Sequence, residues 1–478
     1  MGSGAALGDD SRARAGARVL RALLVAIGAS IAAYAVSDHP FYGGEPGFGP
    51  VQTLIAVVGV GLALCALLPA RIAGAVALAA ATSLAMLAIL EVAGERLLAP
   101  RHRSIYQTDD RLIFKFIPAR ASVMTRSAEN GGETVAHRIN SAGFRGPELR
   151  AAGEMTRLVV YGDSFIHAFY SRDEETFVVR LGAALGERLG RPVEAVNAGV
   201  SSYGPDQIAL KMEGELPWLQ PALVVVAIFA GNDYGDLLRN KIFRLSADGE
   251  LVANPWKLEP RMRLWFELNQ KESILVRSLR NTLGTRRGAR DRYEGTTALD
   301  SLLAEAEREY RSLVVDRDDV VTNTHVDYYS ADVSLTPSAE SARYKVAFMG
   351  AVMRRIRDVA VRSGVPLVFL FIPHPLDVTD EYEWGPIDRR RFPDYDGRNQ
   401  TAFLESHARS LGVPFLSLYD LFRARDARSL YLRGGDDHWN AAGQRLAAEV
   451  LAAHLLASGL LPTGRPVAPA PPRAPAAR

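Results

Sequence analysis

The N-terminal part of this chain is almost free of charged side chains, which leaves few structures open to it. Between residues 22 and 90 only Asp38, Glu45 and Arg71 are charged. Three apolar runs lie at residues 19–36, 51–68 and 72–90. Each has about 18 or 19 residues, close to the number that a helix needs to cross the hydrocarbon core of a membrane. A buried core helix could explain one such run but not three in succession, so we predict three transmembrane helices.

The arginines around these runs predict the topology. Arg12, Arg14, Arg18 and Arg21 form a basic start, which also occurs in signal peptides. Because the first run is long and two more follow, we expect an uncleaved anchor. Arg71 lies between the second and third runs, whereas the first loop has no Lys or Arg. The positive-inside rule therefore places the N-terminus in the cytoplasm and the chain beyond residue 99 outside it, in a multi-pass protein of the cell membrane. Three arginines after the third run oppose this orientation: Arg96, Arg101 and Arg103.

The composition of the whole chain excludes several classes of protein. The chain has 478 residues, 48% of them hydrophobic, so it is not disordered throughout and is long enough for more than one unit. A net charge of +2 gives no reason to expect nucleic acid as a partner. The single cysteine, Cys65, excludes an intrachain disulfide and a cysteine-based zinc site.

Beyond the apolar segment, short β-branched runs alternate with patterned helices. The expected strands are residues 157–161, 193–197, 223–229, 366–372 and 414–417. Helical spacing of apolar residues recurs at 340–363 and after Asn440. Strands alternating with helices in this way predict a parallel α/β sheet that is covered on both faces.

These patterns divide the chain into four parts. Residues 1–98 are the membrane anchor, 99–150 a polar lead-in segment, and 151–461 the α/β domain. A long insertion at about 237–338 separates the third and fourth strands, with a helix expected near residues 299–314. The tail, 462–478, is rich in Pro and Ala and is expected to be disordered.

Polar residues suited to chemistry follow the ends of these strands. The first strand is followed by Gly162-Asp163-Ser164, the second by Asn197-Ala198-Gly199 and the third by Gly231-Asn232-Asp233. Asp436, Asp437 and His438 precede the last helix. In an open parallel sheet, ligands bind beyond the carboxyl ends of the strands. A nucleophile, a base, a residue to orient the base and donors for an oxyanion are therefore all present at one edge.

The four blocks resemble the SGNH, or GDSL-type, hydrolases, in a branch with membrane anchors. The resemblance implies a flavodoxin-like five-stranded sheet and a two-step acyl transfer without metal or cofactor. It implies Ser164 as nucleophile, His438 as general base, and an oxyanion hole formed by the backbone N–H of Ser164, the N–H of Gly199 and the side-chain amide of Asn232. Residues 140–148 also resemble the lead-in of anchored bacterial members.

Two positions depart from the family pattern. The third block has Ala230 where the family usually has glycine, and Gly435 stands where many members place the aspartate that orients the histidine. Asp436, two residues before His438, is our choice for that aspartate. Asp437, directly before the histidine, remains the alternative. Asp163 is expected to organise the turn rather than to act chemically.

Other residues have a structural and a functional interpretation. His374 follows the fourth strand and could line a substrate pocket, although a loop histidine is the simpler interpretation. His167, three residues after Ser164, is expected to be an ordinary helix residue. The insertion carries two tryptophans, Trp256 and Trp265, which we expect to pack in its own core. It also carries a basic run, which we expect to be a solvated loop: Arg277, Arg280, Arg286, Arg287, Arg290 and Arg292.

The combined prediction is a membrane-anchored serine esterase of the SGNH type. Its substrate would be an O-acyl ester of an envelope carbohydrate or lipid. Two alternatives stay open. An O-acyltransferase modifying an envelope glycan would need an acyl donor supplied by an envelope protein partner, because three spans are too few for a channel. A catalytically inactive binding module would keep the fold and lose the chemistry.

Overall fold

The structure is a computed structural model of the chain, and it divides into two compact units. It describes residues 4–36, 50–98, 104–151, 153–263, 266, 296–324, 330–379, 387–433 and 436–461. One unit is built mainly of residues 1–99, and the other holds the remaining strands and helices. Several sequence predictions lie outside the described residues: the basic run, Trp265, Gly435 and the tail from residue 462.

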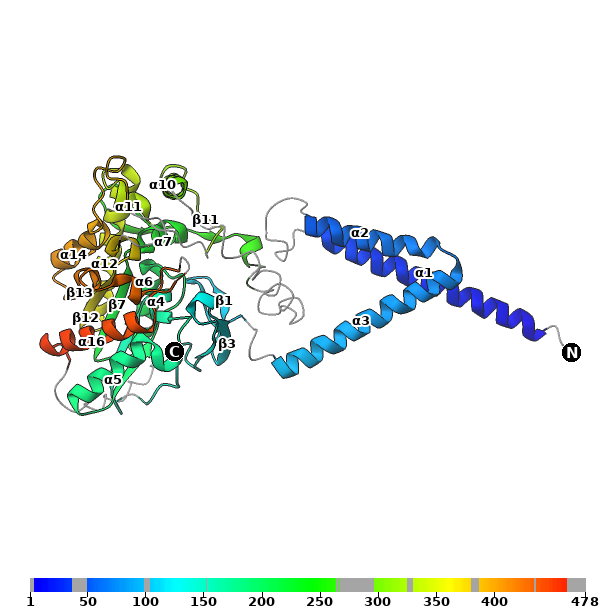
Figure 1. Cartoon of the computed structure of the whole chain (residues 1–478), viewed down its shortest axis with the longest axis horizontal. Coiled ribbons are helices and arrows are strands. Elements are labelled where there is room, and N and C mark those ends of the chain that lie inside the picture. Colours follow the sequence, from blue (N-terminus) through cyan, green and yellow to red (C-terminus); the bar gives the residue numbers. More distant parts are fainter. Residues whose placement is uncertain are drawn as a thin grey trace, which may run out of the picture. The chain divides into compact units, whose positions relative to one another are not determined.

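The N-terminal unit consists of apolar helices (Figure 1). They are α1 (Gly4–Val36), α2 (Pro50–Leu64) with the 3₁₀ turn η2 (Cys65–Leu67), and α3 (Ala70–Leu98). Close packing of α1 on α2 depends on small residues: a Cβ at Gly28 would lie 2.5 Å from the carbonyl oxygen of Gly59, and one at Gly59 would lie 2.6 Å from the nitrogen of Ala32. Small residues at such contacts are typical of helices that associate in membranes.

Two of these helices, not three, are long and apolar enough to cross a membrane. They are Ala15–Val36 and Ala70–Gly94, whereas the middle run forms a shorter apolar helix at Gln52–Leu67. The middle helix ends before Pro69. A residue before proline is forced into extended backbone, and Leu68 has φ −69° and ψ 163°. The expectation of three full spans is therefore supported only in part.

The second unit is built around a five-stranded parallel sheet. Its strands are β5 (Thr156–Tyr161), β6 (Val193–Asn197), β7 (Leu223–Phe229), β12 (Leu367–Ile372) and β13 (Phe415–Ser417). Their spatial order is β13-β12-β7-β5-β6, with every neighbouring pair parallel. This is the flavodoxin-like order, and it confirms the predicted sheet.

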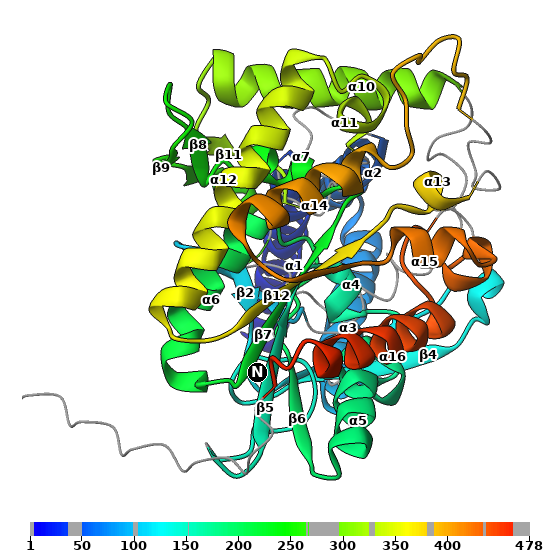
Figure 2. The same ribbon diagram turned by 90° about the vertical axis from the view of Figure 1, so that its left-hand side faces the viewer.

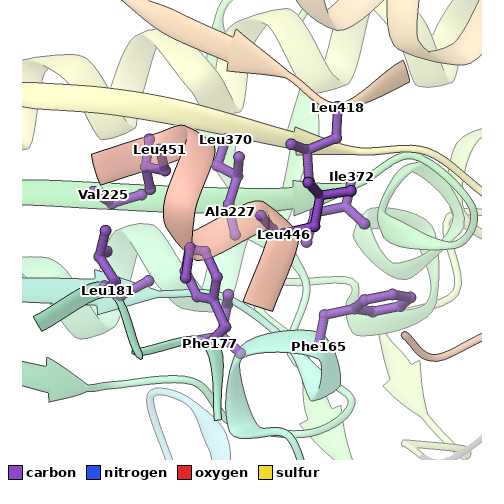
Figure 3. Packing of buried hydrophobic residues seen from close by; sticks show 14 of the residues in the cluster. Phe165, Phe177, Leu181, Val225, Ala227, Leu370, Ile372, Leu418, Leu446 and Leu451 are labelled. Atoms are coloured by element: carbon purple, nitrogen blue, oxygen red, sulfur yellow. The ribbon is translucent and has the colours of Figure 1, made fainter. Parts of the chain in front are cut away.

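Helices cover both faces of the sheet (Figure 2). On one face, α5 (Phe177–Leu189) and α16 (Ala441–Ala457) close a core that contains Leu181 and Leu451 together with Val225 and Leu370 of the strands (Figure 3). On the other face, α12 (Glu340–Arg362) packs against α6 (Pro205–Leu219) and α14 (Asn399–Leu411). Strands β5, β7 and β12 are buried along their whole length, which explains their continuous apolar sequence.

The segment expected to be a polar lead-in forms two antiparallel hairpins within the same compact unit. The first pairs β1 (Tyr106–Asp109) with β2 (Ile113–Phe116), and the second pairs β3 (Arg120–Thr125) with β4 (Thr134–Ile139). The Tyr203 hydroxyl donates a hydrogen bond to the Phe114 carbonyl at 2.5 Å. The first hairpin is thereby bonded to the loop that enters α6.

The insertion adds small elements beyond β7. They are α7 (Asp233–Asn240), the hairpin β8 (Phe243–Leu245) and β9 (Leu251–Ala253), the parallel pair β10 (Lys257–Leu258) and β11 (Val320–Val321), α10 (Thr296–Tyr310) and α11 (Ala331–Leu335). Helix α10 continues into a π-helical turn at Arg311–Val315, so the helix expected near residues 299–314 is present. Short turns complete the unit: α4 (Ser164–His167), α13 (Pro375–Val378), α15 (Tyr419–Arg423), η4 (Ala128–Asn130), η5 (Asp173–Glu175) and η7 (Ala427–Leu430).

Candidate active site

Ser164 lies on a tight turn between β5 and the short helix α4. Asp163 caps this helix, and its Oδ1 accepts a hydrogen bond from the N–H of Phe165 at 3.0 Å. A Cβ at Gly162 would lie 2.3 Å from Cγ1 of Ile166, so only glycine allows the chain to turn this sharply. Asp163 therefore organises the turn, as expected, and Ser164 begins the helix at the carboxyl end of its strand.

A buried arginine holds the other end of α4. The guanidinium of Arg145 donates to the carbonyls of His167 and Ala168 and, at 2.6 Å, to that of Ser171. Its side chain is 1% exposed and forms an ion pair with Asp173 at 3.1 Å. The Ala168 carbonyl also accepts from the N–H of Ser171 at 2.9 Å. Arg145 adds a charged donor to all three carbonyls and so holds the turn that bears Ser164.

His438 lies on a loop that is closed at both ends. Tyr431 and Trp439 form an antiparallel bridge, and the N–H of Leu432 donates to the carbonyl of His438 at 2.8 Å. After the loop, Asn440 caps α16 by accepting from the N–H groups of Ala442 and Gly443. These contacts hold His438 at the start of the last helix, at the same sheet edge as Ser164.

Asp436 is the carboxylate closer to the His438 ring. Its Oδ1 lies 2.7 Å from Nδ1 of His438 and also accepts from the backbone N–H of that residue at 3.0 Å. Oδ1 of Asp437 is 3.4 Å from the same ring nitrogen. A carboxylate bonded at Nδ1 fixes the tautomer and leaves Nε2 for proton transfer.

Charge around His438 favours its protonated form. Burial opposes the imidazolium, but the charge of Asp436, its hydrogen bond to Nδ1 and the charges of Asp437 and Asp163 outweigh burial and raise the pKa of His438 to about 10. Burial would raise the pKa of Asp436, yet the charge of His438 and hydrogen bonds from His438 and Tyr170 lower it. Both shifts favour an imidazolium–carboxylate pair.

Aromatic rings connect His438 to the turn that bears Ser164. The ring of Phe165 stacks on His438 with centroids 5.0 Å apart, and the ring of Tyr170 meets it edge-on at 5.8 Å. The Oγ of Ser164 hydrogen-bonds with Oδ2 of Asp163 at 3.4 Å rather than with His438 within the described part of the chain. Catalytic hydrogen bonds are often long in free enzymes and tighten only around the reacting substrate.

The two residues expected to complete an oxyanion hole have different surroundings. Asn232 follows β7, the strand beside β5, and is 6% exposed; its Oδ1 has no hydrogen-bond partner among the described residues. The N–H of Gly199 donates to Oδ1 of Asn197 at 3.1 Å. A Cβ at Gly199 would lie 2.4 Å from the nitrogen of His167, so packing against α4 already requires glycine there.

The two further histidines also have defined places. Nδ1 of His374 accepts from the N–H of Leu376 at 3.1 Å, and its Nε2 lies 3.8 Å from Oδ2 of Asp437. Burial lowers the pKa of His374 to about 3, so the ring is neutral, and its contact with substrate stays a prediction. His167 is fully buried and bonded through Nδ1 to Ser201 Oγ at 2.7 Å, as a structural helix residue would be.

The loop of Asp436, Asp437 and His438 also brings together three side chains of the types that bind metal ions. The ligand atoms of Asp436, Asp437 and His438 all lie within 4.8 Å of one another. Nδ1 of His438 and Oδ1 of Asp436 are, however, bonded to each other at 2.7 Å, and a metal would have to break this bond. The donor set fits a base with its orienting carboxylate better than a metal centre.

Sequence patterns did not reveal the residues that support the site. Arg145, Tyr170 and Trp439 each contact the nucleophile turn or the base across long sequence separations. Arg145 lies within the segment 140–148 that resembles the lead-in of anchored family members, and Trp439 directly follows His438. These positions are the sequence signals by which Arg145 and Trp439 could have been found. No comparable signal in the sequence marks Tyr170.

A serine on a strand–turn–helix, a histidine held by an aspartate and a flavodoxin-like sheet are together the arrangement that the resemblance to SGNH-type hydrolases predicts. Residues 328–468 match the family model "SGNH hydrolase-like domain, acetyltransferase AlgX". The match covers less than half of the chain and includes His438 but not Ser164. The resemblance to the SGNH hydrolases that the motifs indicate is thereby confirmed. No curated protein matches this chain.

Several solved structures with some similarity to this chain are described as esterases. A two-domain esterase active on acetylated mannans is 12% identical, with a TM-score of 0.32, and the matched part covers 67% of this chain and 54%, about half, of that one. The esterase EstA from Pseudoalteromonas sp. is 10% identical with a TM-score of 0.31, and the matched part covers 63% of this chain and 98% of that one. An acetyl xylan esterase is 11% identical with a TM-score of 0.31, and the matched part covers 63% of this chain and 99% of that one. Similarity this low carries no argument about substrate.

Proposed function

We propose that this chain is a membrane-anchored serine esterase acting on O-acyl esters of an envelope carbohydrate or lipid. The observation that carries the proposal is the bond between Asp436 and Nδ1 of His438, on a loop packed against the turn that bears Ser164. A base oriented in this way beside a serine at a strand end is the arrangement that serine hydrolases share.

The reaction would proceed through an acyl-serine. Nε2 of His438, in its neutral form, takes the proton as Oγ of Ser164 attacks the ester carbonyl. The resulting oxyanion would be bound by the N–H of Ser164 and the amide of Asn232, with Gly199 as a further donor. His438 then protonates the departing alcohol as the ester C–O bond breaks. Water attacks the acyl-serine by the same steps and releases the carboxylic acid.

An O-acyltransferase is the second candidate. The description of the matched family model, an acetyltransferase, favours it. In that case a sugar hydroxyl replaces water as the acceptor, and the Ser164, His438 and Asp436 roles are unchanged. The acyl donor would have to reach the site from a protein partner in the envelope. A binding module without catalysis is the remaining alternative, in which Ser164→Ala would preserve every phenotype.

The proposed location is the cell membrane, with the N-terminus in the cytoplasm and the hydrolase domain outside it. The membrane location is supported by two apolar helices of spanning length. The placement of the hydrolase domain outside requires the shorter apolar helix between them to cross as well, because two spans would return the chain to the cytoplasmic side. If the middle helix also crosses, the chain has three spans and the two ends of the anchor lie on opposite sides. Reporter fusions at residue 99 test this: a periplasmic reporter should be active there and a cytoplasmic reporter inactive.

The proposed chemistry is tested with esters of graded acyl length and the full-length protein in detergent. We expect hydrolysis of acetyl esters, at least 10³-fold slower in Ser164→Ala, because the nucleophile is lost. Ser410→Ala, an exposed serine on α14, is the matched control and should leave the rate unchanged. Release of acid with no transfer to a glycan acceptor favours the esterase, and acylated glycan favours the transferase. Absence of both with folded protein contradicts the proposal.

A further inference from the structure

The loop that carries Asp436 and His438 is closed by bonds at its two ends. The Tyr431–Trp439 bridge and the bond from Leu432 N–H to the His438 carbonyl close it. Between them the chain passes through Arg433 to Asp436, the carboxylate that orients His438. Movement of this part would change the distance between Oδ1 of Asp436 and the imidazole.

The second hairpin contacts this part of the loop through one side chain. Asn130 lies in the loop between β3 and β4, 303 residues from Arg433 in the sequence. Its Nδ2 donates to the carbonyl of Arg433 at 3.0 Å, and its Oδ1 accepts from the N–H of Arg433 at 2.8 Å. An amide side chain bonded to both groups of one residue holds that residue as a neighbouring strand would.

Asn130 is itself held in place. Its Nδ2 also donates to Oγ of Ser127 at 2.8 Å, and its backbone N–H donates to the carbonyl of Ser127. The amide therefore uses both of its N–H groups, and its orientation follows from a carbonyl on one side and an N–H on the other. A side chain bonded on both sides loses little further freedom when it holds Arg433.

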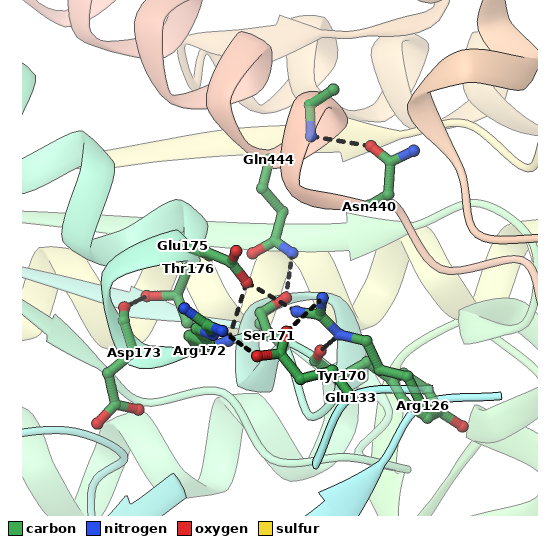
Figure 4. Close-up of polar contacts among 12 residues, drawn as sticks. Arg126, Glu133, Tyr170, Ser171, Arg172, Asp173, Glu175, Thr176, Asn440 and Gln444 are labelled. Atoms are coloured by element: carbon green, nitrogen blue, oxygen red, sulfur yellow. Dashed lines mark hydrogen bonds and ion pairs between the residues drawn. The ribbon is translucent and has the colours of Figure 1, made fainter. Parts of the chain in front are cut away.

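The same hairpin also contacts Tyr170, a residue whose ring lies against His438. Nε of Arg126 donates to the carbonyl of Tyr170 at 2.6 Å, and its guanidinium pairs with Glu175 at 2.7 Å (Figure 4). The Tyr170 ring meets His438 edge-on, and its hydroxyl lowers the pKa of Asp436 through a hydrogen bond. One hairpin loop thus contacts both Arg433 and the backbone of Tyr170, the residue whose ring lies against His438.

We infer that the β3–β4 loop positions the active site through Arg126 and Asn130 and that Asn130 is its main positioning residue. It acts through Arg433 on the Asp436–His438 pair and does not touch substrate. The inference rests on the proposed function, because positioning matters for catalysis only if Ser164 and His438 react. It assigns a role to a segment whose sequence shows only polarity.

The test compares Asn130→Ala with Glu129→Ala in the full-length protein. Glu129 is exposed and adjacent on the same loop, so its removal is the matched control. We expect Asn130→Ala to lower kcat for ester hydrolysis by about tenfold or more, with KM within about twofold, because the base is misplaced rather than the substrate released. The acid limb of the rate profile should move to lower pH as Asp436 loosens. Glu129→Ala should match the wild type.

Two further measurements separate the possible failures. Hydrogen–deuterium exchange in the Ser164→Ala background reports on Arg433 N–H without requiring activity, and Asn130→Ala should speed exchange in the peptide spanning residues 432–438. If the wild-type chain hydrolyses no ester, the proposed function fails, while this exchange still tests the contact. Asn130→Asp keeps the acceptor and loses the donor, so it serves where Asn130→Ala does not fold. Equal rates, pH limbs and exchange in Asn130→Ala and Glu129→Ala overturn the inference, as does a loss of stability with an unmoved pH limb.

Discussion

Trp439 and Phe165 bond the loop of the base to the turn of the nucleophile. The indole Nε1 of Trp439 donates to the backbone carbonyl of Phe165 at 3.1 Å, and the two rings meet edge-on at 5.5 Å. Each of these residues directly follows a proposed catalytic residue, His438 or Ser164. The distance between nucleophile and base is therefore set by a buried hydrogen bond between their neighbours and not by the catalytic side chains alone.

Loss of that hydrogen bond should impair catalysis more than folding. Trp439→Phe keeps an aromatic ring but leaves the Phe165 carbonyl without its donor, at a cost of about 1–3 kcal/mol for a buried group. We expect kcat to fall by about tenfold with a modest fall in Tm. Trp256→Phe, in the insertion, is the matched control. Unchanged kcat in Trp439→Phe would show that the bond does not set the geometry.

Asp436 and Asp437 should differ strongly on substitution. Asp436 lies 2.7 Å from Nδ1 of His438 and Asp437 lies 3.4 Å from it, so Asp436 fixes the tautomer. Asp436→Asn should lower kcat by about 10³-fold or more, as expected when the orienting carboxylate of a serine triad is removed. Asp437→Asn should lower it less than about tenfold. Steady-state kinetics of both variants decide the assignment, and the reverse ranking would make Asp437 the orienting residue.

The pH dependence of ester hydrolysis should be displaced to alkaline values. Only neutral His438 can accept the serine proton, and the pKa of His438 is raised to about 10. The kcat/KM of the free enzyme should therefore rise with pH well above 7. Asp436→Asn should move this limb to lower pH, because the carboxylate charge is lost. A limb near the ordinary histidine value in the wild type would contradict the charge arrangement.

The same pair should leave a signature in stability. A histidine whose folded pKa is raised contributes stability that is complete below its unfolded value and is lost as pH rises through about 10. Asp436, whose folded pKa is lowered, contributes stability above its unfolded value and loses it in acid. The difference in Tm between wild type and His438→Asn should be largest between these limits. A difference that does not change with pH would show that the pair is uncoupled.

Arg145 should be intolerant of replacement even by lysine. Its planar guanidinium bonds to three carbonyls and to Asp173, and a single ammonium cannot reach all of them. Arg145→Lys should lower Tm by about 5 °C or more and reduce kcat, because the nucleophile helix loses its C-terminal partner. Arg362→Lys, in a surface ion pair with Glu213, should change Tm little. Equal Tm values for the two variants would contradict this account.

Local patterns in the sequence were sufficient to predict the sheet and the residues at its edge. Strands β5, β7 and β12 are buried along their whole length, so each appears as an uninterrupted apolar run. Ser164 and His438 follow such runs or precede a capped helix, where local signals are strong. The middle membrane run was overestimated, since its apolar helix, Gln52–Leu67, is shorter than the two of spanning length.

Contacts between distant segments could not be predicted in this way. Asn130 holds Arg433 across 303 residues, and Arg145 caps a helix that begins beyond it in the chain. Such bonds use single polar side chains, which leave no period in the sequence. Some local geometry was also out of reach: the N–H of Gly199 donates to Oδ1 of Asn197, and the residue types alone do not specify this turn.

Covalent labelling of the full-length protein with a fluorophosphonate tests the central claim most directly. The probe reacts with an activated serine, so peptide mapping should find one adduct, on Ser164. It should be absent in Ser164→Ala and formed far more slowly in His438→Asn, in which the base is lost. No adduct on folded protein, or an adduct on another residue at an equal rate in His438→Asn, would contradict the claim that Ser164 and His438 form an active pair.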